Sequence, residues 1–345
     1  MICGGKAMRT IWVPSALGDV SIIDQTRLPE ALVERSLPDV EAAAHAIRSM
    51  QVRGAPLIGV AAAYAMSLAS RSDPSDEALE RAQALLASTR PTAVNLAWAL
   101  AEMRAVWRPL RPMERASACY EKAAAMAEAD VASCRAIALA GAPVLEAHRS
   151  EGAPLRVLTH CNAGWLATVD WGTALAPLYE LHARGVPLHV WVDETRPRNQ
   201  GYLTAWELTE AGIPNTLIAD NAGGLLMRRG EVDVCIVGSD RTARNGDVCN
   251  KIGTYLKALA ARASQVPFYV ALPWSTIDLE IADGDAIPIE EREPSELTTL
   301  PFRVLNPAFD VTPAALVTAL ITDQGVFAPG SLRSRNPPGP ERRRS

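Results

Sequence analysis

The stretch VLTHCNAG, residues 157–164, places a single cysteine just past the end of an apolar run. Cys161 stands beside an expected helix start, a position that lowers the pKa of a thiol and makes its thiolate more available for chemistry. The alternative is a small apolar residue that borders a strand, the interpretation that fits Cys235 inside VDVCIVG. His160 is adjacent, but strand alternation can point it away from Cys161, so no role is assigned to it. The spacing alone leaves both interpretations of Cys161 open.

A second candidate for chemistry is Asp240, which closes the apolar strand VDVCIVGSD. Partial burial at a strand end can raise the pKa of a carboxyl group toward neutrality, and the group can then act as a general acid or base. The alternative is an ion pair with Arg241, Arg244 or Arg196 that only ties loops together.

Two expected helix starts carry arginines. Arg53 and Gly54 precede a helix whose first turn holds Pro56, and Arg90 precedes a second helix start at Thr92. Free backbone N–H groups at a helix start, together with a guanidinium, can hold an anion such as phosphate. One such start is equally consistent with a surface arginine, whereas two favour a phosphate ligand.

Asn250 and Lys251 are expected to open the helix that follows Asp240. There they would add a hydrogen bond and a positive charge to a bound phosphate. A solvated lysine is the ordinary alternative for Lys251.

The strands that would position these groups begin at Leu155. Five β-branched runs alternate there with helical stretches, which is typical of a parallel sheet covered by helices. The runs are RVLTH, PLHVWVDE, NTLIAD, VDVCIVGSD and PFYVALP. Each ends in polar or turn-forming residues, and strand ends of an open α/β sheet share the edge where ligands bind. Any single cluster can instead cap the next helix, but together they predict one shared crevice.

The N-terminal half has a different sequence pattern. The short runs TIWV, VSIID and ALVER predict a small antiparallel sheet, and apolar periodicity predicts helices over 38–50, 56–70, 75–88, 92–107 and 112–148. The expected fold class is α/β: a small N-terminal antiparallel sheet plus a helical domain, followed by a Rossmann-like parallel-sheet domain. The predicted boundaries are 1–150, 151–328 and a disordered Pro- and Arg-rich tail over 329–345.

Composition excludes several functions. The 345 residues carry a net charge of -5, which argues against nucleic acid as a partner. The longest apolar stretches are shorter than the roughly 20 residues that cross a bilayer, and no signal peptide is recognisable, so a cytoplasmic protein without a membrane partner is expected. The six cysteines form no C-x-x-C pair, so neither a zinc site nor a disulfide framework is indicated. No strand is followed by G-x-G-x-x-G, which disfavours an NAD-dependent oxidoreductase.

A series of motifs runs through about residues 8–327. In order they are RGAPLIGVAAAY, RPTAVNLAWAL, LTHCNAG, DETRPRNQG, LTAWEL, IADNAGGLLMRRGEVD, GSDRTARNGDVCNKIGTYLKALA, PFYVALP, STID, IPIEER and NPAFDVTP. This series resembles the methylthioribose-1-phosphate isomerases. Their wider family also includes ribose-1,5-bisphosphate isomerases and regulatory subunits of the eukaryotic initiation factor 2B.

The resemblance implies an aldose–ketose isomerase of methionine salvage that acts on a sugar phosphate as a homodimer, without metal or organic cofactor. It implies catalytic roles for Cys161 and Asp240. The substrate-binding positions that it implies are Arg53, Gly54, Ala55, Arg90, Gln200, Asn250 and Lys251.

Two alternatives to this activity stay open. Trp165, Trp171, Trp274 and Ser239 differ from the family pattern, which indicates an altered pocket near the sugar's 5-position and leaves 5-deoxyribose or ribose 1-phosphate as substrates. The other is a regulatory subunit without catalysis that binds a sugar phosphate or nucleotide. Such a protein has no need for a thiol and a carboxyl group together.

Overall fold

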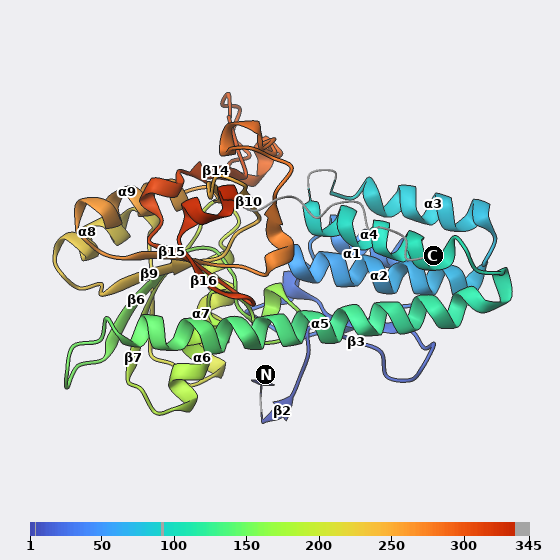
Figure 1. The fold of residues 1–345 in the computed structure, drawn as a ribbon, viewed down its shortest axis with the longest axis horizontal. Helices are drawn as coiled ribbons and strands as arrows, with labels where there is room; N and C mark the ends of the chain where they lie inside the picture. The colour runs from blue at the N-terminus through green and yellow to red at the C-terminus, as the bar shows by residue number, and fades with distance from the viewer. Residues whose placement is uncertain (4, 91–92, 335–345) are drawn as a thin grey trace.

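The structure is a computed structural model that describes residues 1–3, 5–90 and 93–334. Figure 1 shows a helical half on one side, a sheet half on the other, and one long helix that runs along both. The helices of the first half are α1 (Val40–Arg48), α2 (Ala55–Ser72), α3 (Asp76–Ala87), α4 (Val94–Trp107) and α5 (Pro112–Glu146). The five predicted helices are therefore confirmed.

Helix α2 forms the centre of the helical half. Its sequence is apolar on all sides, and every residue from Leu57 to Ser70 is buried. A helix of that kind must be enclosed by others, and α1, α3, α4 and α5 all pack against it.

The N-terminal strands are short. They are β1 (Ile2–Cys3), β2 (Lys6–Ala7), β3 (Ile11–Trp12), β4 (Val20–Ile23) and β5 (Glu34–Leu37). β3, β4 and β5 form the small antiparallel sheet that the sequence predicts, and β1 pairs with β2 in a separate hairpin.

The main sheet has the strand order β16-β15-β12-β9-β6-β7-β8, and its pairs are parallel except for β15 with β16. Its strands are β6 (Leu155–Thr159), β7 (Leu188–Asp193), β8 (Asn215–Ile218), β9 (Val234–Val237), β12 (Phe268–Ala271), β15 (Ala319–Thr322) and β16 (Gly325–Phe327). The five predicted strands are β6, β7, β8, β9 and β12, so the α/β fold class is confirmed. The order reverses between β6 and β9, because β7 and β8 lie on one side of β6 while β9 and β12 lie on the other. Ligands of open α/β sheets bind at such a reversal.

Helices cover this sheet. They are α6 (Ala176–Ala183), α7 (Gln200–Glu210), α8 (Gly223–Arg228) and α9 (Thr254–Ala263). Helix α5 joins the two halves: Cys119 and Ala123 lie in the helical core, and Ile137 and Leu145 lie in the core beneath the sheet. The second half of α5 thus packs with the sheet, although the predicted domain boundary follows it at residue 150.

A second, smaller sheet was not predicted. Its order is β13-β10-β11-β14, formed by β13 (Ile277–Asp278), β10 (Arg241–Ala243), β11 (Val248–Lys251) and β14 (Phe309–Thr312). The expectation that Asn250 and Lys251 open a helix is wrong. Both lie on β11, paired with Asp310 and Phe309 of β14, and α9 begins only at Thr254.

The structure also differs from the predicted disordered tail. Residues Pro329–Ser334 form a 3-10 helix, because Leu332 is fully buried against the sheet core. Residues 335–345 of the predicted tail lie outside the described residues. Each helix in the described part of the chain is either too short or too polar to span a bilayer.

Candidate active site

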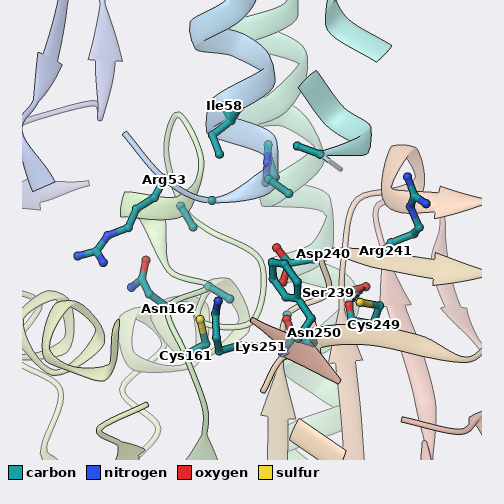
Figure 2. Close-up of a pocket in the computed structure, with 18 of the residues that line it drawn as sticks. Arg53, Ile58, Cys161, Asn162, Ser239, Asp240, Arg241, Cys249, Asn250 and Lys251 are labelled. Atoms are coloured by element: carbon teal, nitrogen blue, oxygen red, sulfur yellow. Dashed lines mark hydrogen bonds between the residues drawn. The ribbon is translucent and has the colours of Figure 1, made fainter. Parts of the chain in front are cut away.

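A cavity lies at the strand reversal of the main sheet, between the sheet and the helical half (Figure 2). Its walls come from the starts of α2 and α4, from the segments after β6 and β9, and from β11. All nine site residues named from the sequence line it: Cys161, Asp240, Arg53, Gly54, Ala55, Arg90, Gln200, Asn250 and Lys251. Figure 2 shows the Cys161 sulfur and the Lys251 side chain close together in the view, with Asp240 and Asn250 to one side.

Cys161 follows β6 in a left-handed backbone conformation, with φ of 68°. Its N–H donates to Thr195 Oγ1 at 2.8 Å, and its carbonyl accepts from Thr204 Oγ1 at 2.8 Å. A non-glycine residue keeps such a conformation only where its surroundings fix it. Burial raises the pKa of the thiol to about 11, against the positive charge of Lys251. The expectation of a lowered pKa is therefore wrong, since the loss of water around the sulfur outweighs the nearby cations.

Asp240 follows β9, the strand next to β6. Burial raises the pKa of its carboxyl group above the usual range, against the charges of Lys251 and Arg90. Within the described residues Asp240 forms no ion pair with Arg241, Arg244 or Arg196. The Arg241 guanidinium lies 3.8 Å from Asp278, and its side chain points away from the group around Asp240 in Figure 2. A raised pKa keeps a larger fraction of the carboxyl group protonated than in an ordinary aspartate, which favours proton donation.

The start of α2 faces the cavity through Gly54 and Ala55. Gly54 has φ of 99°, and a Cβ added there would lie 2.3 Å from Ala167 O, so only glycine fits. No side chain caps this helix start, which leaves its first N–H groups available for an anion. Burial lowers the pKa of Arg53 to about 10, so the guanidinium stays charged at neutral pH.

Two further cations complete this wall. Arg90 Nη2 lies 3.2 Å from Glu290 Oε2, and Arg90 Nε is buried without a partner among the described residues. The helix-start position Thr92 lies outside the described residues. Lys251 lies 4.4 Å from the centre of the Phe309 ring, and burial lowers the pKa of its ammonium group. Partly buried cations without full pairing favour an anionic ligand.

Gln200 and Asn250 supply amides. Gln200 begins α7 and is buried, with Oε1 unpaired within the described part of the chain. The Asn250 amide donates to Thr254 Oγ1 at 3.0 Å.

His160 also lines the cavity, but both of its ring nitrogens are engaged by neighbouring protein groups. Its Nε2 donates to Ile252 O at 2.9 Å, and its Nδ1 lies 2.9 Å from Asp193 Oδ2. Asp193, His160 and Asp220 form a cluster of the kind that can hold a metal ion, but Lys257 Nζ already lies 3.1 Å from Asp193 Oδ2. The ammonium group supplies the positive charge that this cluster needs.

Asn162 and Thr173 also line the cavity, and neither was predicted as a site residue from the sequence. Asn162 follows Cys161 at the same strand end, so the strand-end pattern was a usable signal. By contrast, Trp165, Trp171 and Trp274 are not among the described residues that line the cavity. Ser239 does line it, so it is the one of these departures that touches the candidate site.

The model of the initiation factor 2 subunit family matches residues 51–329. The chain belongs to this family.

The proteins to which this chain is similar have names of two kinds, isomerase and initiation factor subunit. A methylthioribose-1-phosphate isomerase of Methylorubrum populi is 59% identical over 344 residues, covering 94% of each chain. The crystal structure of 5-methylthioribose 1-phosphate isomerase from Pyrococcus horikoshii OT3 superposes with a TM-score of 0.85 at 39% identity, covering 95% of each chain. A structure titled as subunit delta of translation initiation factor eIF-2B from A. fulgidus has a TM-score of 0.81 at 41% identity, covering 94% of this chain and 96% of that one.

Proposed function

We propose that this chain is an isomerase of methionine salvage that converts 5-methylthioribose 1-phosphate to 5-methylthioribulose 1-phosphate. The observation that carries the proposal is one cavity in which the Cys161 thiol and the Asp240 carboxyl group stand among Arg53, Arg90 and Lys251. The 59% identity to a relative named for this activity supports the substrate.

The phosphate is held by the three cations and the open N-terminus of α2. Arg90 exchanges part of its contact with Glu290 for a phosphate oxygen, because both anions compete for the same guanidinium. Holding the dianion also keeps it from leaving during the reaction.

Asp240 acts first as a general acid. A sugar phosphorylated on its anomeric oxygen cannot open its ring by losing that hydroxyl proton, so the ring oxygen must be protonated. The Asp240 proton goes to the ring oxygen, and the bond from that oxygen to C1 breaks. The raised pKa of Asp240 keeps a larger protonated fraction available near neutral pH than an ordinary aspartate has.

Hydrogen then moves from C2 to C1 beside Cys161. With a pKa of about 11 the thiol is uncharged at neutral pH, so it is not a ready base for the C2 proton. An uncharged, desolvated sulfur suits a direct shift of hydrogen with its electron pair. The C2 hydroxyl proton returns to the Asp240 carboxylate, which restores the acid.

The rival function is a regulatory subunit without catalysis, favoured by the 41% identity to the structure titled as an initiation factor subunit. NMR detection of ketose formation separates the two. The purified chain is mixed with 5-methylthioribose 1-phosphate, with 5-deoxyribose 1-phosphate or with ribose 1-phosphate. We expect fastest turnover of the first, and no turnover of any of the three would favour the regulatory function.

The same spectra recorded in D₂O report the route of hydrogen. A direct shift leaves C1 of the product nearly free of deuterium. Extensive deuterium at C1 would show proton abstraction by a base instead.

A homodimer and a cytoplasmic location belong to the same proposal, supported by the resemblance to the isomerases. Analytical ultracentrifugation is expected to give twice the chain mass of 37.0 kDa. A monomer at micromolar concentration would contradict the dimer without touching the activity.

A further inference from the structure

A buried carboxylate outside the cavity lies directly behind Cys161. Glu207 is on α7, and its side chain accepts hydrogen bonds from Asn162 Nδ2 at 2.8 Å, the Trp165 N–H at 2.8 Å and the Leu166 N–H at 3.2 Å. The Tyr179 hydroxyl donates to it at 2.8 Å. Only 1% of Glu207 is exposed, so water is not available to replace these partners.

Three of these donors belong to the segment that follows Cys161, residues 162–166. The fit is close enough to dictate the sequence there: a Cβ on Gly164 would lie 1.8 Å from Glu207 Oε2. The carboxylate also receives the first N–H groups of the 3-10 helix Trp165–Ala167, which has no other side-chain cap.

Thr204, one turn earlier on α7, extends the contact to Cys161 itself. Its hydroxyl donates to the Cys161 carbonyl at 2.8 Å and accepts from Asn162 Nδ2 at 3.1 Å. Helix α7 therefore fixes both the backbone of Cys161, which is left-handed, and the direction of the Asn162 amide. With Nδ2 bound to Glu207 and Thr204, Asn162 Oδ1 is left as a buried acceptor without a partner among the described residues.

We propose that Glu207 is a positioning residue, which sets the place of the Cys161 sulfur and turns the Asn162 amide so that its oxygen can accept a hydrogen bond from a sugar hydroxyl. The inference rests on the proposed isomerase function for its effect on turnover, but not for its effect on the thiol.

The chemistry of the carboxylate explains why this position needs Glu. An ionised carboxylate is an acceptor only, with about four lone-pair sites, and here each of its oxygens receives two donors. Burial raises the pKa of Glu207 to about 7, and the donors oppose that shift because they stabilise the ionised form. In Glu207→Gln one oxygen becomes an NH₂ group. Whichever way that amide turns, a backbone N–H, of Trp165 or of Leu166, loses its acceptor.

The test compares Glu207→Gln with Tyr179→Phe in the full chain. Tyr179→Phe removes a hydrogen bond from the same carboxylate without touching residues 162–166, so it is the matched control for a loss of stability alone. Two quantities are measured: the rate at which iodoacetamide alkylates Cys161, followed by mass spectrometry of its peptide, and kcat and KM for 5-methylthioribose 1-phosphate.

Glu207→Gln is expected to raise the alkylation rate at least about fivefold and to lower kcat at least about tenfold, on the scale of a misplaced catalytic group. Tyr179→Phe is expected to leave the alkylation rate and kcat within about twofold of the wild type. Both variants, Glu207→Gln and Tyr179→Phe, are expected to melt at a lower temperature than the wild type. Equal effects of the two variants, or an unchanged alkylation rate in Glu207→Gln, would overturn the inference.

Should Glu207→Gln not fold, Glu207→Asp keeps the carboxylate but shortens the side chain by one methylene, so its oxygens cannot meet all four donors, and the same fivefold rise in alkylation is expected. No rise would then count against the inference. Because alkylation needs no substrate, the inference is tested even if the wild-type chain turns over none of the sugar phosphates.

Discussion

Cys161 and Asp240 differ from ordinary side chains of their kind because both are largely shielded from water at the cavity wall. Burial raises the pKa of each, which keeps the thiol uncharged and holds a proton on the carboxyl group to a higher pH. The cations Lys251 and Arg90 oppose the shift of Asp240 without cancelling it. Asp240 is therefore suited to donate a proton, and the Cys161 thiol is suited to stay uncharged beside the substrate rather than to attack it as a nucleophile.

The pH dependence of turnover tests the role of Asp240. As a general acid it must be protonated in the free enzyme, so kcat/KM is expected to fall as pH rises through its raised pKa, by about tenfold per pH unit once it is ionised. Asp240→Asn carries no titrating carboxyl group, so the kcat/KM of its residual activity should not show this fall, the alkaline limb of the pH profile. An identical alkaline limb in Asp240→Asn would assign the titration to another group.

At the scale of elements, strand ends could be predicted well and strand pairing poorly. The β-branched runs of β6 and β9 end in polar residues, which was enough to bring Cys161 and Asp240 to one edge. Lys251 was misplaced onto a helix because the short strand β11 owes its conformation to its partners β10 and β14. Glu207 stands in the motif LTAWEL but was given no role, since a glutamate inside a helix normally faces solvent.

The lowered thiol pKa expected for Cys161 failed for a related reason. Sequence shows the neighbouring helix start, but it does not show how completely other segments cover the sulfur. Desolvation depends on that coverage, so its sign at a given residue follows only from the folded chain.

The start of α2 is expected to hold the phosphate, and a substitution at Gly54 tests this. Gly54→Ala places a Cβ 2.3 Å from Ala167 O, so the helix start must move away from the cavity wall. We expect KM for the sugar phosphate to rise at least about tenfold, because the N–H groups and Arg53 lose their alignment with the phosphate.

Gly152→Ala is the matched control. Gly152 also has a positive φ, of 74°, but nothing lies within 4 Å of an added Cβ. Gly152→Ala should lower the free energy of unfolding by about 1 kcal/mol through backbone strain and leave KM unchanged. A normal KM in Gly54→Ala would remove the α2 start from the phosphate site.

At the scale of the whole molecule, the cavity lies where the helical half meets the sheet half. Arg53 and Arg90 come from the helical half, while Cys161, Asp240 and Lys251 come from the sheet half. A ligand that contacts the helical half and the sheet half raises the free energy of unfolding of the whole chain, because it binds the folded chain and not the unfolded one.

Inorganic phosphate is therefore expected to raise the melting temperature of the chain. At ten times its Kd the stabilisation is about 1.4 kcal/mol. Arg53→Met should abolish the shift, and Arg184→Met, at an exposed arginine paired with Glu180, should preserve it. Equal shifts in the two variants would indicate binding outside the cavity.

The joint action of Cys161 and Asp240 is tested by the rate of ketose formation from 5-methylthioribose 1-phosphate in Cys161→Ser and Asp240→Asn, with circular dichroism as the check on folding. Each variant is expected to keep the fold and to lose at least about 100-fold in kcat, the scale of a lost acid group or a misplaced reacting centre. A rate near that of the wild type in either variant would contradict the account of a thiol and a carboxyl group acting together in one cavity.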